Sequence, residues 1–279
     1  MSSWTTEDIV VNGVCMHVTR TGGDRPPVVL AHGFSDSGLC WTPVAAALEA
    51  DYDLIMVDAR GHGRLDAPES GYGPVEHAGD LHGVIAALGL HRPAVMGHSM
   101  GGATTYALAG LYPDVPGAIL IEDAAPLRVA PPRASSGNDR LAGMHRWIQT
   151  LKRQTPEEMI AAQRTQTPTW SEAEFGPWAE AKLRLSLNVL NRSDAAPIDW
   201  HVVLPRITCP ALLITADPEH GAGVTVERAA EMQTVVPQLR VAHVPGAGHN
   251  IRRDQFDRFL EVVRSFLAPW GATYQTTGT

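Results

Sequence analysis

Short apolar runs alternate with longer segments of helical length along most of this chain. This alternation constrains the fold most, because short apolar runs fit strands buried on both faces, and parallel strands need a helix-length crossover between them. Eight segments fit strands: 9–11, 16–20, 28–31, 54–57, 94–97, 118–121, 211–215 and 240–244. The segments that fit flanking helices are 43–50, 75–88, 100–112, 224–235 and 254–267. We therefore predict an α/β fold with a mostly parallel eight-stranded sheet.

The first two strand segments flank Asn12-Gly13. This dipeptide is typical of a two-residue hairpin turn, so we expect the sheet to begin with an antiparallel pair.

The alternation stops between residues 124 and 205. A loop rich in proline and serine opens this stretch, and helical segments at 141–151, 156–164 and 175–191 follow without an intervening strand. We predict a core domain built from 1–123 and 206–279, with a helical cap inserted at 124–205. Four of the seven tryptophans lie in the insertion, where they either fill a helical layer or line an apolar pocket; they are Trp147, Trp170, Trp178 and Trp200.

The composition limits the partners and the compartment. Lys and Arg total 22 against 30 Asp and Glu, and no basic cluster is present, so we expect no binding to nucleic acid or to a membrane surface. No apolar stretch is long enough to span a bilayer. Cys15, Cys40 and Cys209 are widely spaced, and the N-terminus lacks a readable signal peptide, so we expect a cytoplasmic protein. The oligomeric state is left open.

A possible nucleophile lies between the fifth strand segment and the helix that follows it. Gly97-His98-Ser99-Met100-Gly101 fits the pattern G-x-S-x-G at a strand-to-helix turn. Glycines on both sides allow the strained backbone that such a turn needs, and the helix N-terminus offers N–H groups to an anion. We predict that Ser99 is a catalytic nucleophile.

A serine hydroxyl needs a base that accepts its proton. His249 follows Pro245-Gly246-Ala247-Gly248 just after the last strand segment, at the sheet edge expected to present Ser99, so we predict it as the base. His32 is an alternative base, although its ring fits a structural hydrogen-bonding role better. Metal-binding spacings such as H-E-x-x-H are absent from the sequence, so we expect neither a metal nor another cofactor.

A third group must orient the imidazole, and the residues leave its identity open. Asp217 and Glu219 follow one strand segment, and Glu122 and Asp123 follow another, so all four carboxylates belong to the same sheet edge. For the oxyanion, we predict the backbone N–H groups of Phe34, in the loop after the third strand segment, and of Met100.

Together these residues resemble the α/β-hydrolase fold superfamily from about residue 9 to residue 267. His32-Gly33-Phe34 is similar to its oxyanion loop, 58–63 to the loop after its fourth strand, 97–101 to its nucleophile elbow, and Gly248-His249 to its histidine loop. Leu65 departs from the loop motif, which usually has serine there.

The resemblance favours one acid. Aligning Ala216-Asp217-Pro218-Glu219 with the family's loop after the penultimate strand puts Glu219 in the acid's place. This stretch resembles the branch that contains acyl-homoserine lactone lactonases and related esterases. The resemblance therefore implies a catalytic triad of Ser99, His249 and Glu219.

The expected activity is hydrolysis of a carboxylic ester or lactone of a moderately apolar small molecule through an acyl-enzyme. Fold and triad alone do not fix the reaction. Carbon–carbon bond hydrolysis, perhydrolysis, and a slow-turnover receptor for a small lactone are the alternatives.

Overall fold

The computed structural model describes residues 4–64, 66–126, 137–191 and 195–277. Leu65 and most of the expected loop rich in proline and serine, at 127–136, lie outside these ranges.

Eight strands of the described chain form one sheet in the order β1-β2-β4-β3-β5-β6-β7-β8. They are β1 (Thr5–Val11), β2 (Val14–Arg20), β3 (Pro27–Ala31), β4 (Asp53–Val57), β5 (Ala94–His98), β6 (Ala118–Glu122), β7 (Ala211–Thr215) and β8 (Leu239–His243). Strand β2 pairs antiparallel with β1 and β4, and the other pairs are parallel. Asn12 and Gly13 turn the first hairpin with positive φ angles of 52° and 75°. The predictions of a mostly parallel sheet and an antiparallel start are confirmed.

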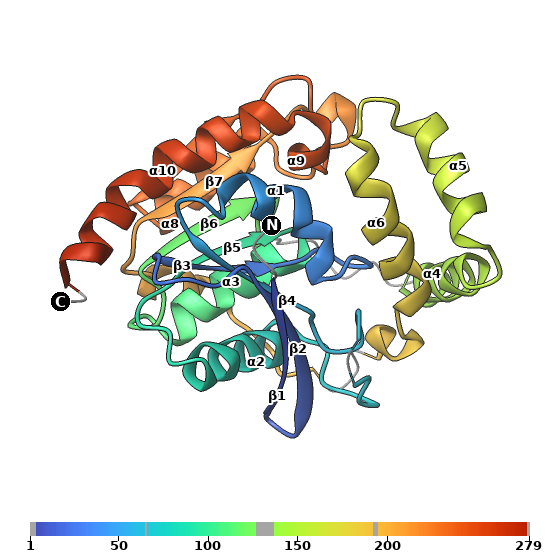
Figure 1. Cartoon of the computed structure of the whole chain (residues 1–279), viewed down its shortest axis with the longest axis horizontal. Coiled ribbons are helices and arrows are strands. Elements are labelled where there is room, and N and C mark those ends of the chain that lie inside the picture. Colours follow the sequence, from blue (N-terminus) through green and yellow to red (C-terminus); the bar gives the residue numbers. More distant parts are fainter. Residues whose placement is uncertain (1–3, 65, 127–136, 192–194, 278–279) are drawn as a thin grey trace.

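Helices cover both faces of the sheet (Figure 1). One face packs against α2 (Pro74–Ala87), α3 (Met100–Leu111) and α8 (Val226–Val235), and the other against α1 (Thr42–Leu48) and α10 (Phe256–Thr277). Successive strand residues point to opposite faces, so Val29 joins the first core and Val28 and Leu30 the second. Both faces are therefore apolar, as the short apolar runs predict.

Three of the helices between β6 and β7 lie together at one end of the sheet (Figure 1). These cap helices are α4 (Gly137–Leu151), α5 (Pro156–Gln166) and α6 (Glu172–Arg184). The third ends before the predicted residue 191, because Leu185 leaves helical geometry at φ −59° and ψ 121° and Ser186 caps the short 3-10 helix η2 (Leu187–Leu190). The division of the chain into core and cap domains stays a prediction.

None of the helices in the described ranges combines the length and apolar character needed to cross a membrane.

Candidate active site

Ser99 lies at the sharp turn between β5 and α3, as the sequence predicts. Its backbone has φ 51° and ψ −109°, a conformation that residues with a Cβ rarely adopt. Such strain persists only where the surrounding structure holds it, and it is common at functional sites.

The glycines of the motif are required by close backbone contacts. A Cβ on Gly97 would lie 2.2 Å from the carbonyl oxygen of Gly101, and a Cβ on Gly101 would lie 2.1 Å from that of Ala31. Both distances are far below van der Waals contact, so only glycine fits. The G-x-S-x-G pattern thus follows from the packing of α3 against β3 and β5.

His249 lies in the loop between β8 and the short helix α9 (Ile251–Asp254). Its Nδ1 atom is 2.5 Å from Oδ2 of Asp123, the residue just after β6. Asp123 is buried, and its carboxylate also accepts hydrogen bonds from the backbone N–H groups of Gly223 (2.7 Å) and Val224 (3.0 Å). The carboxylate that orients His249 is therefore fixed from three directions.

The expectation that Glu219 orients the base is wrong in this structure. Glu219 is exposed in the 3-10 helix η4 (Pro218–His220), while Asp123 holds the imidazole. Alignment of a short loop motif placed the acid after β7, whereas a left-handed turn at Asp123 (φ 45°) brings that side chain to His249.

The other two candidate carboxylates have different partners. Asp217 Oδ1 is 2.8 Å from Nε2 of His243, and Asp217 Oδ2 accepts from the N–H of Gly246 at 2.7 Å. Glu122 is buried and accepts from both the backbone N–H and Nη1 of Arg252, each at 2.9 Å. Asp217 therefore stabilises the loop after β8, and Glu122 neutralises a buried arginine.

The contact with Asp123 determines the protonation of His249. Because the carboxylate accepts from Nδ1, the neutral ring carries its proton there and leaves Nε2 as an acceptor. The hydrogen bond to Asp123 raises the pKa of His249 above its usual value, and burial of the ring opposes this shift. A protonated imidazole at this position is thereby stabilised.

His32, the alternative base, is buried and fully engaged. Its Nδ1 is 2.8 Å from the carbonyl oxygen of Gly33, and its Nε2 accepts from the N–H of Ala59 at 2.9 Å. Both ring nitrogens are therefore hydrogen-bonded to backbone groups, which is the structural role that the sequence favours for this residue.

The predicted oxyanion donors lie beside the nucleophile. Phe34, Ser99, Met100 and His249 line one cavity of about 540 Å³, which we call the strand-edge cavity. The structure thus brings together four of the five predicted site residues, and Glu219 is the exception. The oxyanion role of Phe34 and Met100 stays a prediction.

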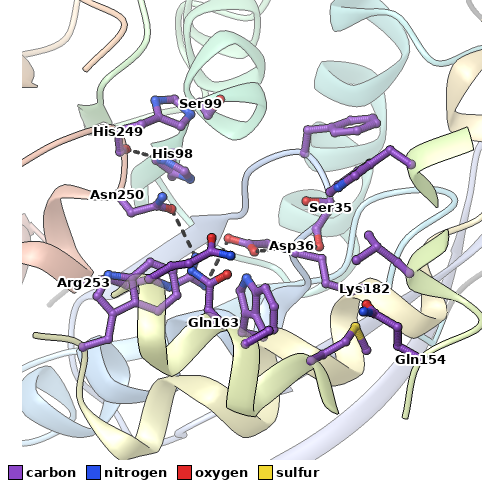
Figure 2. A pocket seen from close by; sticks show the side chains of 18 residues that line it. Ser35, Asp36, His98, Ser99, Gln154, Gln163, Lys182, His249, Asn250 and Arg253 are labelled. Atoms are coloured by element: carbon purple, nitrogen blue, oxygen red, sulfur yellow. Dashed lines mark hydrogen bonds and ion pairs between the residues drawn. The ribbon is translucent and has the colours of Figure 1, made fainter. Parts of the chain in front are cut away.

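A second cavity of about 560 Å³ extends from the same residues below the cap helices, and we call it the cap cavity (Figure 2). Ser99 and His249 lie together at one end of it, and Trp147, Trp170 and Trp178 line its walls. Trp170 and Trp178 also pack in the helical layer of the cap, so both sequence interpretations of these tryptophans apply. Trp200 packs against the sheet core instead.

A buried ionic network forms part of the wall of the cap cavity. Asp36 is paired with Lys182 (3.1 Å), Arg252 (3.1 Å) and Arg253 (3.2 Å), and Glu174 is paired with Arg253 at 2.9 Å. Burial would raise the pKa of Asp36, but the three cations hold that pKa well below its usual value. The network joins α6 of the cap to the core, because Glu174 and Lys182 belong to α6.

Sequence reasoning missed this network and the role of His98. The His98 ring is buried, lies 4.8 Å from the His249 ring between centroids, and has Nε2 2.9 Å from the carbonyl oxygen of His249. Burial holds the pKa of His98 well below its usual value, so the ring is neutral. The position of His98 next to Ser99 in the G-x-S-x-G motif indicated that it lies near the site. For Arg252 and Arg253, nothing in the sequence indicates that these charged residues are buried.

In the described ranges, no three His, Cys, Asp or Glu side chains are grouped to hold a metal ion. The chemistry that the described side chains themselves can perform is proton abstraction from Ser99 by His249, with Asp123 stabilising the resulting charge.

Several known proteins are similar to this chain over most of its length. N-formylmaleamate deformylase from Pseudomonas putida is 28% identical over 93% of this chain and 95% of its own length. 2-(Acetamidomethylene)succinate hydrolase from Mesorhizobium japonicum is 25% identical over 89% and 90% of the two chains. The crystal structure of an esterase from Rhodococcus superposes with a TM-score of 0.73 at 25% identity, over 97% of this chain and 100% of that one.

A model of the alpha/beta hydrolase family matches residues 28–262. This match spans most of the chain and confirms the resemblance inferred from the motifs, so the protein belongs to the alpha/beta hydrolase family.

Proposed function

We propose that this protein is a serine hydrolase that cleaves a carboxylic ester or lactone of a moderately apolar small molecule. Ser99 attacks the carbonyl carbon, and His249 accepts the hydroxyl proton and returns it to the leaving group. Asp123 orients the imidazole, and the N–H groups of Phe34 and Met100 stabilise the oxyanion. Water then hydrolyses the acyl-enzyme.

The observation that supports this proposal most is the strained Ser99 next to a carboxylate-bound imidazole. Ser99 and His249 line the same two cavities, and Figure 2 shows their side chains beside each other. Nucleophile, base and orienting acid are the three parts that acyl transfer by serine requires. Similarity to an esterase structure also supports ester hydrolysis.

Turnover of p-nitrophenyl esters by the wild-type protein and by Ser99→Ala tests the proposal. We expect kcat to fall by roughly 10⁴- to 10⁶-fold in the variant, because serine and histidine act as one unit. Ser265→Ala, at an exposed position of α10, is the matched control and should keep wild-type activity. A fluorophosphonate probe should transfer its phosphonyl group to the Ser99 oxygen with loss of HF, so the wild-type protein should gain the mass of the probe less HF and Ser99→Ala should gain none.

Activity of Ser99→Ala within about tenfold of the wild type would contradict the proposal. Covalent labelling without turnover of any ester would instead favour the slow-turnover receptor.

The curated relatives favour a second candidate, hydrolysis of an acyl–nitrogen bond. By its name, one of them removes a formyl group from N-formylmaleamate. The same triad serves esters and amides, because both reactions pass through a tetrahedral intermediate. Comparing kcat/KM for an activated ester and the corresponding anilide decides between the two. If kcat/KM for the ester exceeds that for the anilide by no more than the ratio of their uncatalysed hydrolysis rates, amide hydrolysis is favoured as the function.

A further inference from the structure

The wall of the cap cavity is positively charged. Among its lining residues, Lys182 and Arg253 are cations, and Asp36 is an anion with a pKa held well below its usual value. Glu174 and Arg252, which complete the network, do not line this cavity. With His249 neutral, the side chains that line the cavity therefore have a net charge of about +1, and the carboxylates of Glu174 and Glu122, which pair with Arg253 and Arg252, lie behind them.

The carboxylate oxygens of Asp36 are already occupied. Oδ1 of Asp36 accepts from Nζ of Lys182 at 3.1 Å, and Oδ2 accepts from Nη2 of Arg252 at 3.1 Å. Nη2 of Arg253 also lies 3.2 Å from Oδ2. Asp36 consequently has little capacity left to accept a hydrogen bond from a ligand.

Donors, by contrast, are in surplus. Lys182 donates to the carbonyl oxygen of Ser35 (2.9 Å) and to Asp36, which leaves one of its three N–H groups. Asn250 must accept from Nη1 of Arg253 through its oxygen, at 3.2 Å, because a guanidinium only donates. Its amide N–H groups make no hydrogen bond within the described residues, and Nη1 of Arg253 has a second N–H besides the one that it donates to Asn250. A wall with spare donors and a net positive charge matches an anion.

Apolar surface accompanies these donors. Trp147, Leu151, Met159 and Trp178 line the same cavity. Figure 2 shows Arg253 and Lys182 apart from Ser99 and His249, with Asp36 between the two cations. A ligand that reaches from Ser99 to the cations therefore needs an apolar body between its scissile bond and its charge.

We infer that the substrate carries a carboxylate, bound in the cap cavity by Lys182, Asn250 and Arg253, on the apolar body of the ester proposed above. The net wall charge of about +1 matches a carboxylate, which is a monoanion, better than a phosphate, which is close to a dianion at neutral pH. This inference rests on the proposed function, since it places the charge relative to Ser99.

Two pairs of esters test the inference. Mono-p-nitrophenyl glutarate and p-nitrophenyl pentanoate differ by a carboxylate in the acyl part, and p-acetoxybenzoate and p-tolyl acetate differ by one in the leaving group. In the wild type we expect kcat/KM to favour the anionic member of at least one pair by about tenfold or more, the effect of a charge-assisted hydrogen bond.

Lys182→Gln should reduce that preference to about one. Lys152→Gln is the matched control, because the chain has only two lysines and Lys152 is exposed and does not line the cavity. If Lys182→Gln fails to fold, Asn250→Asp replaces it: its carboxylate still accepts from Arg253 but repels the substrate, so the preference should again disappear.

Two results would overturn the inference. One is the absence of an anionic preference in both pairs. The other is an equal loss for neutral and anionic esters in Lys182→Gln, which would mean that Lys182 only holds α6 on the core.

Calorimetry with glutarate separates this inference from the proposed function. If no ester is hydrolysed but glutarate binds the wild type and not Lys182→Gln, the hydrolase proposal fails and the carboxylate site stands. If esters are hydrolysed without anionic preference and glutarate does not bind, the hydrolase proposal stands and the carboxylate site fails.

Discussion

Asp123 and His249 are separated by 126 positions in the sequence and joined by a 2.5 Å hydrogen bond across the carboxyl edge of the sheet. Strand β7 lies between β6, which precedes Asp123, and β8, which precedes the histidine loop. The hydrogen bond between Asp123 and His249 therefore crosses the end of β7. Asp217, the carboxylate that follows β7, contacts His243 and Gly246 instead.

This relationship predicts the effect of Asp123→Asn. Gly223 and His249 share Oδ2 of Asp123, while Val224 donates to Oδ1, so one asparagine oxygen cannot serve all three donors. The NH₂ group would face either the N–H of Val224, or both the N–H of Gly223 and Nδ1 of His249, and the second orientation favours the tautomer that cannot accept the serine proton. Both orientations lack the negative charge that stabilises the imidazolium, so we expect kcat on an activated ester to fall by about 10²- to 10⁴-fold. Circular dichroism checks that the variant folds.

Glu219→Gln is the matched control, because Glu219 is exposed in η4. It should keep wild-type kcat. The reverse result, an inactive Glu219→Gln and an active Asp123→Asn, would restore the assignment implied by the family resemblance and contradict the geometry described above.

The pH dependence of activity tests the protonation of His249. The base works only when neutral, so kcat/KM should rise with pH, with a midpoint above the usual histidine value of 6.5, because hydrogen bonding to Asp123 raises the pKa of His249. In Asp123→Asn the remaining activity should rise at lower pH than in the wild type. An unchanged midpoint in this variant would mean that another group controls the profile.

The fold and the positions of Ser99 and His249 at one sheet edge could be predicted from the sequence, because each depends on local patterns. Short apolar runs specify buried strands, and the G-x-S-x-G turn depends on contacts within a few residues and one neighbouring strand. The histidine loop is similarly recognisable from its small residues and its place after the last strand.

The acid depends on geometry that no local pattern records. Four carboxylates lie at or just after the ends of β6 and β7, at the same sheet edge. The one that contacts His249 is determined by one left-handed residue, Asp123 (φ 45°), and by the other partners of the remaining carboxylates. Asp36, Lys182 and Arg253 were missed for a related reason: charged residues are normally exposed, and these are buried only because they meet one another.

Backbone strain at Ser99 predicts a difference between two inactive variants. Ser99→Gly removes the Cβ that the φ of 51° disfavours, while Ser99→Ala keeps it. We expect Ser99→Gly to have the higher free energy of unfolding, by about 1 kcal/mol, after allowing for the greater unfolded-state entropy of glycine. Urea titration gives the difference.

The control for this prediction has the opposite sign. At Ser265, an exposed position in α10, glycine should be less stable than alanine by about 1 kcal/mol, the usual helix-interior penalty. If glycine is also the less stable replacement at Ser99, the turn stores no appreciable strain.

Removal of one charge from the ionic network should loosen the cap. Glu174 and Arg253 are both buried and 2.9 Å apart, and Glu174→Gln leaves the guanidinium without a compensating charge on that side. We expect the free energy of unfolding to fall by about 3 kcal/mol, the lower end of the cost of breaking a buried pair, since glutamine can still accept a hydrogen bond. Glu180→Gln on the same helix removes an exposed pair with Arg184 and should cost less than about 0.5 kcal/mol. Equal small losses in urea titrations of the two variants would show that the buried pair does not hold α6 on the core.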